Sequence, residues 1–232
     1  MSSSHMKRLA MPRSWPLTRK TEVWISRPRP CGHPIERCMA LGVVLRDILG
    51  VAQSMREAKR ALATRRILVD GRVTTDMRRG VGIMDVLTVG DEHYRCVLDN
   101  NGKLRYASIS AKDAALKLCR VDGKTTIKGG VTQLNLHDGR NILIDDANKY
   151  NTMDSLVLDV NTQKVKKHHK FESGANCYLI GGSHIGSTAT MSEYAVKRSS
   201  KDNEVLFDDF GTIVDHVFVV GDANLPLDEV NA

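Results

Sequence analysis

The sequence predicts a multidomain α+β fold, with a small α/β domain, a central β-rich domain and a C-terminal β-barrel. Two observations carry this prediction. Apolar residues recur with helical spacing between residues 41 and 65, and short β-prone runs follow them at once. In the last third of the chain, short alternating strands are separated by Gly, Ser and Asp turns. The length of 232 residues and the 41% hydrophobic content are sufficient for real cores.

Positive charge is concentrated at the N-terminal end. Residues 1–80 hold 17 Lys and Arg against 6 Asp and Glu, whereas residues 81–232 hold 17 against 21. The whole chain carries a net charge of +7, and only 5% of its residues are aromatic. We therefore expect an anionic partner that binds the N-terminal third of the chain.

Residues 1–40 are predicted to form a basic, Pro-rich extension without a core of its own. Five of the six prolines lie here, and proline removes backbone donors and keeps the chain extended. Trp15 and Trp24 stand among arginines, and such side chains can stack on bases and pair with phosphates. We expect an arm that becomes ordered on a nucleic acid; a plain disordered leader is the alternative.

Residues 41–100 are predicted to form the first folded unit, two helices against a small sheet. "VVLRDILGV" indicates a short helix that ends near Gly50. Ser54 and Glu57 have the spacing of a capping box, in which each side chain accepts a hydrogen bond from a free backbone N–H. A second helix should therefore start at once.

The second helix has an apolar face and a cationic face. Met55, Ala58 and Leu62 fall at positions that share one side and should face the core. Another side carries Arg56, Lys59 and Arg60. Basic helix faces are often merely solvated, but those usually alternate with Glu, and here Glu57 is the single Glu among eight cations. Uncompensated charge favours binding to phosphates, driven by counterion release.

A hairpin and further strands follow the second helix. "ILV" supplies a strand that turns back at Asp70-Gly71, a dipeptide suited to the positive φ angles of a tight turn. The apolar run Val81–Gly90 is predicted as one strand, and "EHYRCVLD" as the next. Eight cations gather around the junction of helix and hairpin: Arg56, Lys59, Arg60, Arg65, Arg66, Arg72, Arg78 and Arg79.

Residues 101–170 are predicted to form a central β-rich domain. Ser110 and Asp113 indicate the start of a helix over "AKDAALKLCR", and "VTQLNLHDGRNILI" alternates apolar residues around an Asp138-Gly139 turn. "DSLVLDVNTQKVKKHHKF" adds a strand and a short basic patch. Residues 171–232 contain four short strands with Gly, Ser and Asp turns, which is typical of a small barrel.

The sequence shows no catalytic or metal-binding constellation. "GGSHIGST" spaces Gly181 and Gly186 like a phosphate-binding loop, but Ser187 stands where that loop needs a lysine. Cys31, His33 and Cys38 lack the further close-spaced ligands of a structural zinc site. The five scattered cysteines contain no CxxC pair and fit reduced thiols, and no run is long enough for a membrane span or a signal peptide.

Nine blocks of the sequence resemble one known family. They are "HMKRLAMPRSWPLTRK", "RPRPCGHPIER", "LRDILGVA", "REAKRAL", "ILVDGRVTTD", "VGIMDVLTV", "YRCVLD", "VTQLNLHDGRNIL" and "GSHIG", in this order along nearly the whole chain. Together they closely resemble the archaeal and eukaryotic small-subunit ribosomal protein S4e family. The resemblance implies an N-terminal extension (1–40), an S4-type RNA-binding domain (41–100), a central β-rich domain (101–170) and a KOW domain, a small SH3-like barrel, with a short C-terminal tail (171–232).

The KOW motif implied by the resemblance covers Tyr178–Tyr194, with Gly186 as its glycine. Two residues depart from the family pattern. Ser183 stands where a basic residue is frequent, and Ala189 stands where glycine is common. These departures weaken the expectation that this loop contacts RNA directly.

The resemblance implies a structural constituent of the small ribosomal subunit that binds small-subunit (16S-type) rRNA beside neighbouring ribosomal proteins of the 30S subunit. We expect a cytoplasmic, archaeal protein without enzyme activity, cofactor, metal, membrane contact or small-molecule substrate. The alternative is a free S4-domain RNA-binding chaperone or ribosome-associated factor. The basic residues predicted to contact RNA are Lys7, Arg8, Arg13, Arg19, Lys20, Arg27, Arg29, Arg37, Arg46, Arg56, Lys59, Arg60, Arg65, Arg66, Arg72, Arg78 and Arg79.

Overall fold

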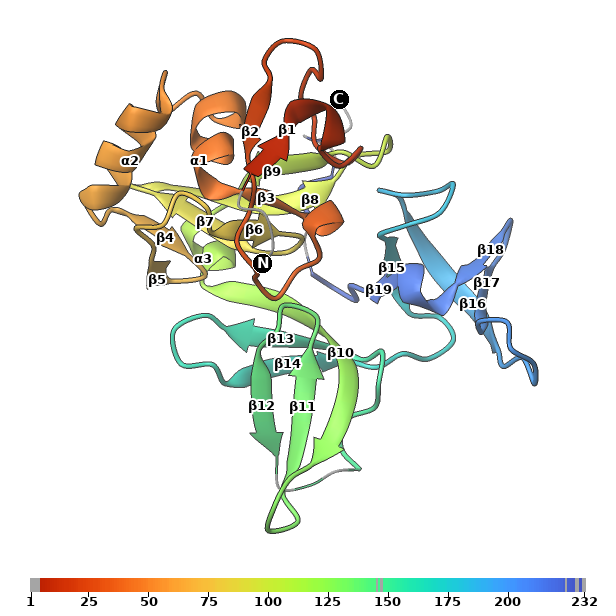
Figure 1. The fold of residues 1–232 in the computed structure, drawn as a ribbon. Helices are drawn as coiled ribbons and strands as arrows, with labels where there is room; N and C mark the ends of the chain where they lie inside the picture. The colour runs from red at the N-terminus through yellow and green to blue at the C-terminus, as the bar shows by residue number, and fades with distance from the viewer. Residues whose placement is uncertain (1–4, 145, 147, 224, 228–229, 231–232) are drawn as a thin grey trace.

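The computed structural model describes residues 5–144, 146, 148–223, 225–227 and 230, which form mostly antiparallel β-sheets (Figure 1). Three five-stranded sheets contain most of the strands. In Figure 1 the red-to-yellow N-terminal half lies above the green central sheet, and the blue C-terminal sheet lies at the right. None of the helices among the described residues is long and apolar enough to cross a membrane.

The N-terminal segment is folded onto the unit that follows it. β1 (His5–Lys7) pairs antiparallel with β2 (Trp24–Ser26), and a 3-10 turn, η1 (Arg8–Ala10), follows β1. Trp15 is 1% exposed, and its indole Nε1 donates a 2.9 Å hydrogen bond to the Cys38 carbonyl. The prediction of an extended arm is therefore wrong for the described part of this segment, because burial of its apolar residues holds it on the core.

Two helices lie on one side of the first sheet (Figure 1). A 3-10 turn, η2 (Ile35–Arg37), leads into β3 (Cys38–Ala40). α1 (Leu41–Val43) follows and continues into a π-helical turn, η3 (Val44–Ile48). Gly50 follows this turn with a φ of +65°, a value that glycine adopts without strain, so the helix ends where the sequence predicted. α2 (Met55–Ala63) is the second predicted helix.

The first sheet is antiparallel with the strand order β5-β4-β7-β8-β9. Its strands are β4 (Ile67–Val69), β5 (Arg72–Val73), β7 (Val86–Val89), β8 (Glu92–Leu98) and β9 (Leu104–Ser108). A separate pair joins β3 (Cys38–Ala40) to β6 (Gly80–Gly82). The sheet thus includes a strand beyond residue 100, where the first unit was expected to end.

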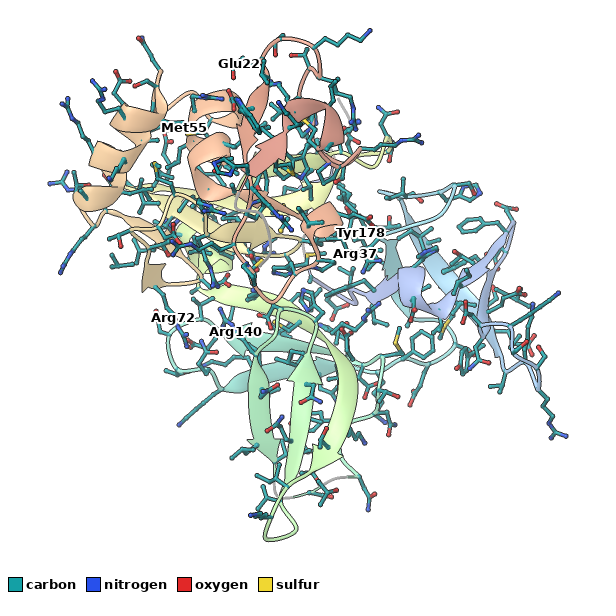
Figure 2. The ribbon with its side chains drawn as sticks, viewed as in Figure 1. Glu22, Arg37, Met55, Arg72, Arg140 and Tyr178 are labelled. Atoms are coloured by element: carbon teal, nitrogen blue, oxygen red, sulfur yellow. The ribbon has the colours of Figure 1, made fainter. Side chains whose placement is uncertain are left out.

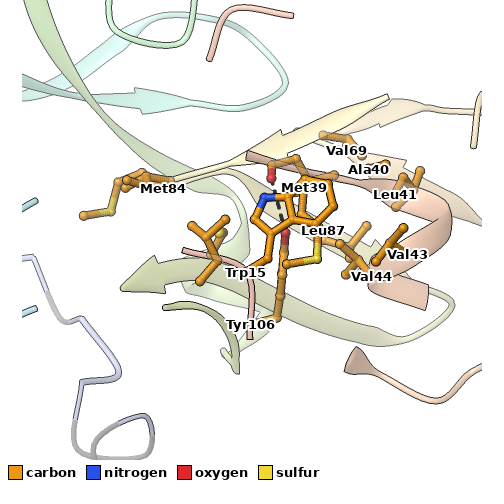
Figure 3. Packing of buried hydrophobic residues seen from close by; sticks show 14 of the residues in the cluster. Trp15, Met39, Ala40, Leu41, Val43, Val44, Val69, Met84, Leu87 and Tyr106 are labelled. Atoms are coloured by element: carbon orange, nitrogen blue, oxygen red, sulfur yellow. Dashed lines mark hydrogen bonds between the residues drawn. The ribbon is translucent and has the colours of Figure 1, made fainter. Parts of the chain in front are cut away.

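The core of the first unit combines all of these elements. Figure 3 shows Trp15 of the N-terminal segment in one cluster with Leu41 and Val44 of the helices and with Leu87 and Tyr106 of the sheet. Leu41, Val44 and Leu87 are fully buried. Met11, Trp15 and Ile25 of the N-terminal segment are also buried in this cluster. Burial of each such side chain contributes about 1.5–3 kcal/mol, so the N-terminal segment is a substantial part of this core.

A turn interrupts the single strand predicted for residues 81–90. β6 ends at Gly82, Met84 adopts a φ of +65°, and β7 starts at Val86. The Asp85 carboxylate accepts a 2.7 Å hydrogen bond from the Gly82 N–H and thereby closes the turn. Met84 is apolar and fully buried although it lies in the turn, so the sequence shows no polar break that would have predicted the turn.

The central sheet has the strand order β12-β11-β10-β13-β14. Its strands are β10 (Leu116–Thr126), β11 (Thr132–Leu136), β12 (Asn141–Ile144), β13 (Ser155–Asp159) and β14 (Val165–His169). The predicted hairpin turn at Asp138-Gly139 joins β11 to β12, and Gly139 has a φ of +77°.

The helix predicted over residues 111–120 is reduced to one turn, α3 (Ala111–Ala114). Its predicted cap is present, since the Asp113 N–H donates a 3.2 Å hydrogen bond to Ser110 Oγ. From Leu116 onward the chain pairs with β13 instead. The prediction was wrong here because Lys117 is fully buried and bound to carboxylates of other segments, and such tertiary contacts override helix propensity.

The C-terminal sheet has the strand order β18-β17-β16-β15-β19 and encloses its own apolar cluster. Its elements are β15 (Asn176–Leu179), β16 (Thr188–Ala195), β17 (Glu204–Phe207), β18 (Gly211–Ile213), η4 (Val214–His216) and β19 (Val217–Val219). The Tyr178 hydroxyl accepts a 2.8 Å hydrogen bond from the Leu98 N–H and donates one of 2.8 Å to the Leu98 carbonyl. This contact attaches the C-terminal sheet to β8.

A buried ionic cluster joins the first sheet to the central sheet. The Lys117 ammonium on β10 lies 2.7 Å from Asp70, 2.6 Å from Asp85 and 2.9 Å from Asp138. The Arg140 guanidinium lies 2.8 Å from Asp70 and 3.1 Å from Asp138. Asp70 belongs to the β4–β5 turn, whereas Asp138 and Arg140 belong to the β11–β12 turn. The cluster therefore fixes the two hairpins against each other.

The pKa values in this cluster follow from its balance of charges. Burial alone would lower the pKa of Lys117, but Asp85 and Asp70 raise it well above its ordinary value. Burial alone would raise the pKa of Asp138, but Lys117 lowers it to about 2. The pKa of Asp70 is raised, by burial and then by the neighbouring Asp85 carboxylate. Asp70 is thus the carboxylate most easily protonated as the pH falls.

Candidate nucleic-acid interface

Helix α2 begins with the predicted cap. The Glu57 N–H donates a 3.3 Å hydrogen bond to Ser54 Oγ, as the capping box requires. The Glu57 carboxylate accepts a 2.8 Å hydrogen bond from the N–H of Gln53, one residue before the expected donor. Ala58 and Leu62 are fully buried, so they hold the helix on the core. The capping role keeps the carboxylate of Glu57 away from the cations further along the helix.

The cationic face of α2 is exposed to solvent and continues past the end of the helix. Arg65 follows with a φ of +59°, and this left-handed residue turns the chain into β4. Asp70 and Gly71 have φ angles of +50° and +71°, which match a hairpin turn with two left-handed positions. Arg72 stands directly behind that turn and is exposed.

Seven exposed basic side chains form a continuous group along the chain, and we name this group the cationic surface. Within the part of the chain that the structure describes, none of the seven forms an ion pair with a carboxylate. Their charge is therefore not neutralised by the protein, which is the condition for strong binding of a polyanion. The members are Arg56, Lys59, Arg60, Arg65, Arg66, Arg72 and Arg79.

A cleft of about 470 Å³ borders this surface between the β4–β5 hairpin and the Asp138-Gly139 turn. Arg72, Arg79 and Arg140 line it, and Figure 2 shows Arg72 and Arg140 where the first unit meets the central sheet. Arg140 is not among the residues that the sequence predicted to contact RNA. Its position two residues after Asp138, next to a predicted turn, was the one sequence feature that could have indicated its role. Its partner Asp70 is 70 residues away in sequence, so the pairing itself could not be predicted.

Two of the predicted RNA contacts have structural roles instead. Arg8 is only 5% exposed, and its Nε donates a 2.6 Å hydrogen bond to the Thr18 carbonyl. Arg46 forms a two-pronged contact with Asp47, with the closer pair of atoms 2.9 Å apart. Contrary to the prediction, the Arg8 guanidinium holds the N-terminal segment together and is not available to a phosphate.

Other predicted cations tie the N-terminal segment to the edge of the cationic surface. Arg29 lies 2.9 Å from Asp76, and Arg78 Nε donates a 3.1 Å hydrogen bond to the Arg27 carbonyl. These contacts place the segment after β2 beside the chain that leads into β6. Arg29 is nevertheless 62% exposed in its side chain and can reach a partner.

The remaining predicted cations lie on the N-terminal segment, away from α2. The Lys7 ammonium lies 3.8 Å from the centre of the exposed Trp24 ring, and Lys20 is exposed. Arg13, Arg19 and Arg37 line a different groove. The structure therefore places the predicted residues of α2 and the β4–β5 hairpin close together. The predicted residues of the N-terminal segment lie on other surfaces.

The candidate metal ligands are engaged with one another and with the ionic cluster. Cys31 Sγ lies 3.8 Å from Cys38 Sγ, and His33 Nε2 lies 3.0 Å from Asp85 Oδ1. The hydrogen bond from the Cys38 thiol lowers the pKa of Cys31 to about 6. Among the described residues, no group of three or more His, Cys, Asp or Glu side chains is arranged to hold a metal ion.

Comparison with known proteins decides the family. Residues 90–165 match the model described as "Ribosomal family S4e", and residues 2–36 match the "RS4NT (NUC023) domain". The small ribosomal subunit protein eS4 of Methanocella arvoryzae is 39% identical over 227 residues, which cover 95% of either chain. The chain belongs to the ribosomal S4e family.

Further S4e relatives are equally similar along the chain. The eS4 protein of Methanosphaera stadtmanae is 42% identical over 226 residues, covering 95% of this chain and 93% of its own. The eS4 protein of Methanocaldococcus jannaschii is 40% identical over 231 residues, covering 94% of either chain. The family expected from the nine sequence blocks is therefore confirmed.

The fold also matches a solved S4e structure. The crystal structure of the 30S ribosomal protein S4e from Thermoplasma acidophilum superimposes with a TM-score of 0.71 at 32% sequence identity. The match covers 82% of this chain and 98% of that chain. A mostly β fold with several sheets is therefore confirmed, whereas the finer assignment of S4-type and KOW domains stays a prediction.

Proposed function

We propose that this S4e-family protein is a structural constituent of the small ribosomal subunit that binds small-subunit rRNA through the cationic surface. Its relatives are named as small ribosomal subunit proteins. The observation that carries the RNA contact is the group of seven exposed cations without a carboxylate partner among the described residues. In this role the protein acts in the cytoplasm beside other ribosomal proteins, without catalysis or a cofactor.

The geometry of the cationic surface suits a phosphate backbone. Six of its seven members are arginines, whose planar guanidinium groups can bind phosphate oxygens in pairs. The cap of α2 and its buried face keep Arg56, Lys59 and Arg60 on the solvent side of the helix, so the helix backbone does not need to reorder when RNA binds. Each neutralised phosphate releases counterions, which makes the affinity fall steeply with salt.

We also propose the domain roles that the family resemblance implies. Residues 41–100, with α2 and the β4–β5 hairpin, would act as the S4-type RNA-binding domain. Residues 101–170 would be a central β-rich domain, and residues 171–232 a KOW domain. The separate apolar clusters of the central and C-terminal sheets support this division, because each sheet has a core of its own.

Reversal of charge on the cationic surface should weaken RNA binding without unfolding the protein. We expect the variant Arg60→Glu, Arg65→Glu, Arg66→Glu to bind a small-subunit rRNA transcript at least about tenfold more weakly, with a salt slope lower by about 2 to 3. The three side chains are exposed and make no contact with the core, so the melting temperature should change little. Filter binding across a salt series would measure both quantities.

A matched control separates a local site from a simple change of net charge. Lys112, Lys128 and Lys201 are exposed and lie on α3, on the β10–β11 turn and near β17. Their reversal to Glu changes the net charge equally and should leave most of the affinity intact. Equal losses in the two variants, or no loss in the first, would show that the cationic surface is not the rRNA site.

A further inference from the structure

A second groove, of about 640 Å³, lies where the N-terminal segment meets the C-terminal sheet. One wall is the chain around Met11 and Arg13, and the other contains Ile180, Gly181 and His216. The turn between β8 and β9 contributes Gly102. The groove is thus built from three parts of the chain that are distant in sequence, and α2 takes no part in it.

The ionisable side chains that line this groove are mostly cationic. Arg13, Arg19 and Arg37 face it together with His216, and Glu36 is the one carboxylate among its described lining residues. Arg19 donates a 2.8 Å hydrogen bond to the Leu9 carbonyl, which fixes the loop after η1. Arg13 is exposed, and its side chain has no hydrogen bond or ion pair with another described residue.

Arg37 is the most informative residue of the groove. Its side chain is partly buried, yet its guanidinium makes no hydrogen bond or ion pair with any residue that the structure describes. Burial lowers the pKa of Arg37, and the neighbouring Arg120 guanidinium lowers it further, whereas the carboxylates of Asp122, Asp215 and Glu36 raise it and offset these effects only in part. A guanidinium that has lost water and lies beside a second cation is costly unless an anion joins it.

Arg120 is held in place by three hydrogen bonds to other residues, none of them to Arg37. Its Nε lies 2.8 Å from Asp122, and its Nη1 donates hydrogen bonds of 3.0 and 2.9 Å to the carbonyls of Asp215 and Val217. Arg120 therefore links the central sheet to η4 and β19. Since Asp122 pairs with Arg120, the positive charge that faces the groove comes from Arg13, Arg19 and Arg37.

One wall of the groove is held in place by the glycine-rich loop "GGSHIGST", whose glycine spacing resembles that of a phosphate-binding loop. A Cβ at Gly186 would overlap the Asp99 carbonyl, and a Cβ at Gly181 would overlap the His216 ring. Ile185 packs close to Gly102, where a Cβ would lie 3.1 Å from its Cδ1. The glycines thus allow the loop to dock on the β8–β9 turn, and the groove exists before any ligand binds.

We propose that this groove binds a phosphodiester segment of the RNA, as a second contact site at the opposite side of the first unit from α2. The proposal rests on the proposed rRNA-binding function and adds a separate site to it. Figure 2 shows Arg37 near Tyr178, at the place where the first unit approaches the C-terminal sheet. An RNA strand in the groove would contact both of these units and hold them in one orientation.

RNA fits the groove better than an acidic protein segment does. The two guanidinium groups that have no hydrogen bond or ion pair with another described residue stand on separate segments, so that successive phosphates of one strand can reach Arg13 and Arg37 in turn. The surrounding N-terminal segment carries further exposed cations, Lys7 and Lys20, which extend the positive potential beyond the groove. An acidic peptide remains a distinct outcome of the experiment.

The test compares two double variants of the full chain. Arg13→Ala with Arg37→Gln removes two guanidinium groups from the groove, and Lys128→Ala with Lys201→Gln removes the same charge elsewhere. We expect the groove variant to bind a small-subunit rRNA transcript about three- to tenfold more weakly and to lower the salt slope by about 1 to 2, with no such change in the control. Thermal melting should change little, since neither side chain has a hydrogen bond or ion pair with the part of the chain that the structure describes. The single variant Arg13→Ala repeats the test at a fully exposed position.

The outcomes separate this proposal from the function on which it rests. If the groove variant binds RNA with wild-type affinity and slope while reversal of the cationic surface weakens binding, the groove is not an RNA site and the proposed function stands. If RNA binding is unchanged but small subunits assembled with the groove variant lose a neighbouring protein, the groove binds an acidic protein segment and our assignment is wrong. Photo-crosslinking from position 9, beside the groove, should attach to RNA if the proposal holds.

Discussion

Replacement of Lys117 with alanine is expected to lower the free energy of unfolding by about 3 to 5 kcal/mol at neutral pH. The ammonium is fully buried and lies within 2.9 Å of three carboxylates, so its loss leaves buried negative charge against a single remaining guanidinium, that of Arg140. Denaturation by urea, followed by circular dichroism, would measure the loss. Lys112→Ala, at an exposed position on α3, is the control and should change stability by less than about 0.5 kcal/mol.

The loss should depend on pH in a defined direction. Lys117 lowers the pKa of Asp138 to about 2, so this carboxylate contributes stability above the ordinary Asp value and loses it as the pH falls toward 2. In the variant, protonation relieves the repulsion between carboxylates. The difference between wild type and variant should therefore shrink below about pH 4. A difference that stays constant from pH 7 to pH 3 would contradict the assigned ionic cluster.

Replacement of Trp15 with alanine is expected to lower the free energy of unfolding by about 3 to 5 kcal/mol. Trp15 is 1% exposed, belongs to the same buried cluster as Leu41 and Leu87, and its indole donates a 2.9 Å hydrogen bond to the Cys38 carbonyl. Its removal leaves a cavity and an unsatisfied carbonyl. Urea denaturation followed by circular dichroism would give the change.

Trp24 provides a matched control, because it is the second of only two tryptophans and lies on the same segment. Its ring is 53% exposed and contacts Lys7. Trp24→Ala should cost less than about 1 kcal/mol. If the two variants were equally stable, the N-terminal segment would not be part of the core, and the prediction of an extended arm would be restored.

Local signals in the sequence predicted the elements that carry the cationic surface. The Ser54 cap, the helix over residues 55–63 and the Asp70-Gly71 turn each depend on neighbouring residues, so short-range chemistry determines them. The same holds for the turn at Asp138-Gly139. The candidate interface around α2 could therefore be assigned without long-range information.

The errors occurred where distant contacts decide the structure. Residues 116–120 have helical propensity, but Lys117 reaches Asp70 and Asp85, which are 47 and 32 residues away. Trp15 looks like a base-stacking residue among arginines, but its pocket is formed by β3 and the helices that follow. Neither pairing leaves a pattern in a single sequence, because periodicity reports only which face of an element is apolar.

The groove at Arg37 could not be predicted from the sequence, because it forms where segments distant in sequence meet. The sequence predicted Arg37 as a basic RNA contact and showed a glycine-rich loop around Gly186, but it did not show that the two border one groove. Only the docking of the C-terminal sheet, through Tyr178 and Leu98, brings them to the same groove. Glycines that allow close approach of two chain segments are easily mistaken for a ligand-binding loop.

The most direct measurement is the sedimentation of this protein in a lysate from normally growing cells, detected across a sucrose gradient at physiological salt. We predict that most of the protein sediments with the small ribosomal subunit, and that high salt releases it more readily when the cationic surface is reversed. A protein found mainly at the top of the gradient during normal growth would contradict the proposed function. That result would favour a free RNA-binding chaperone built on the same fold.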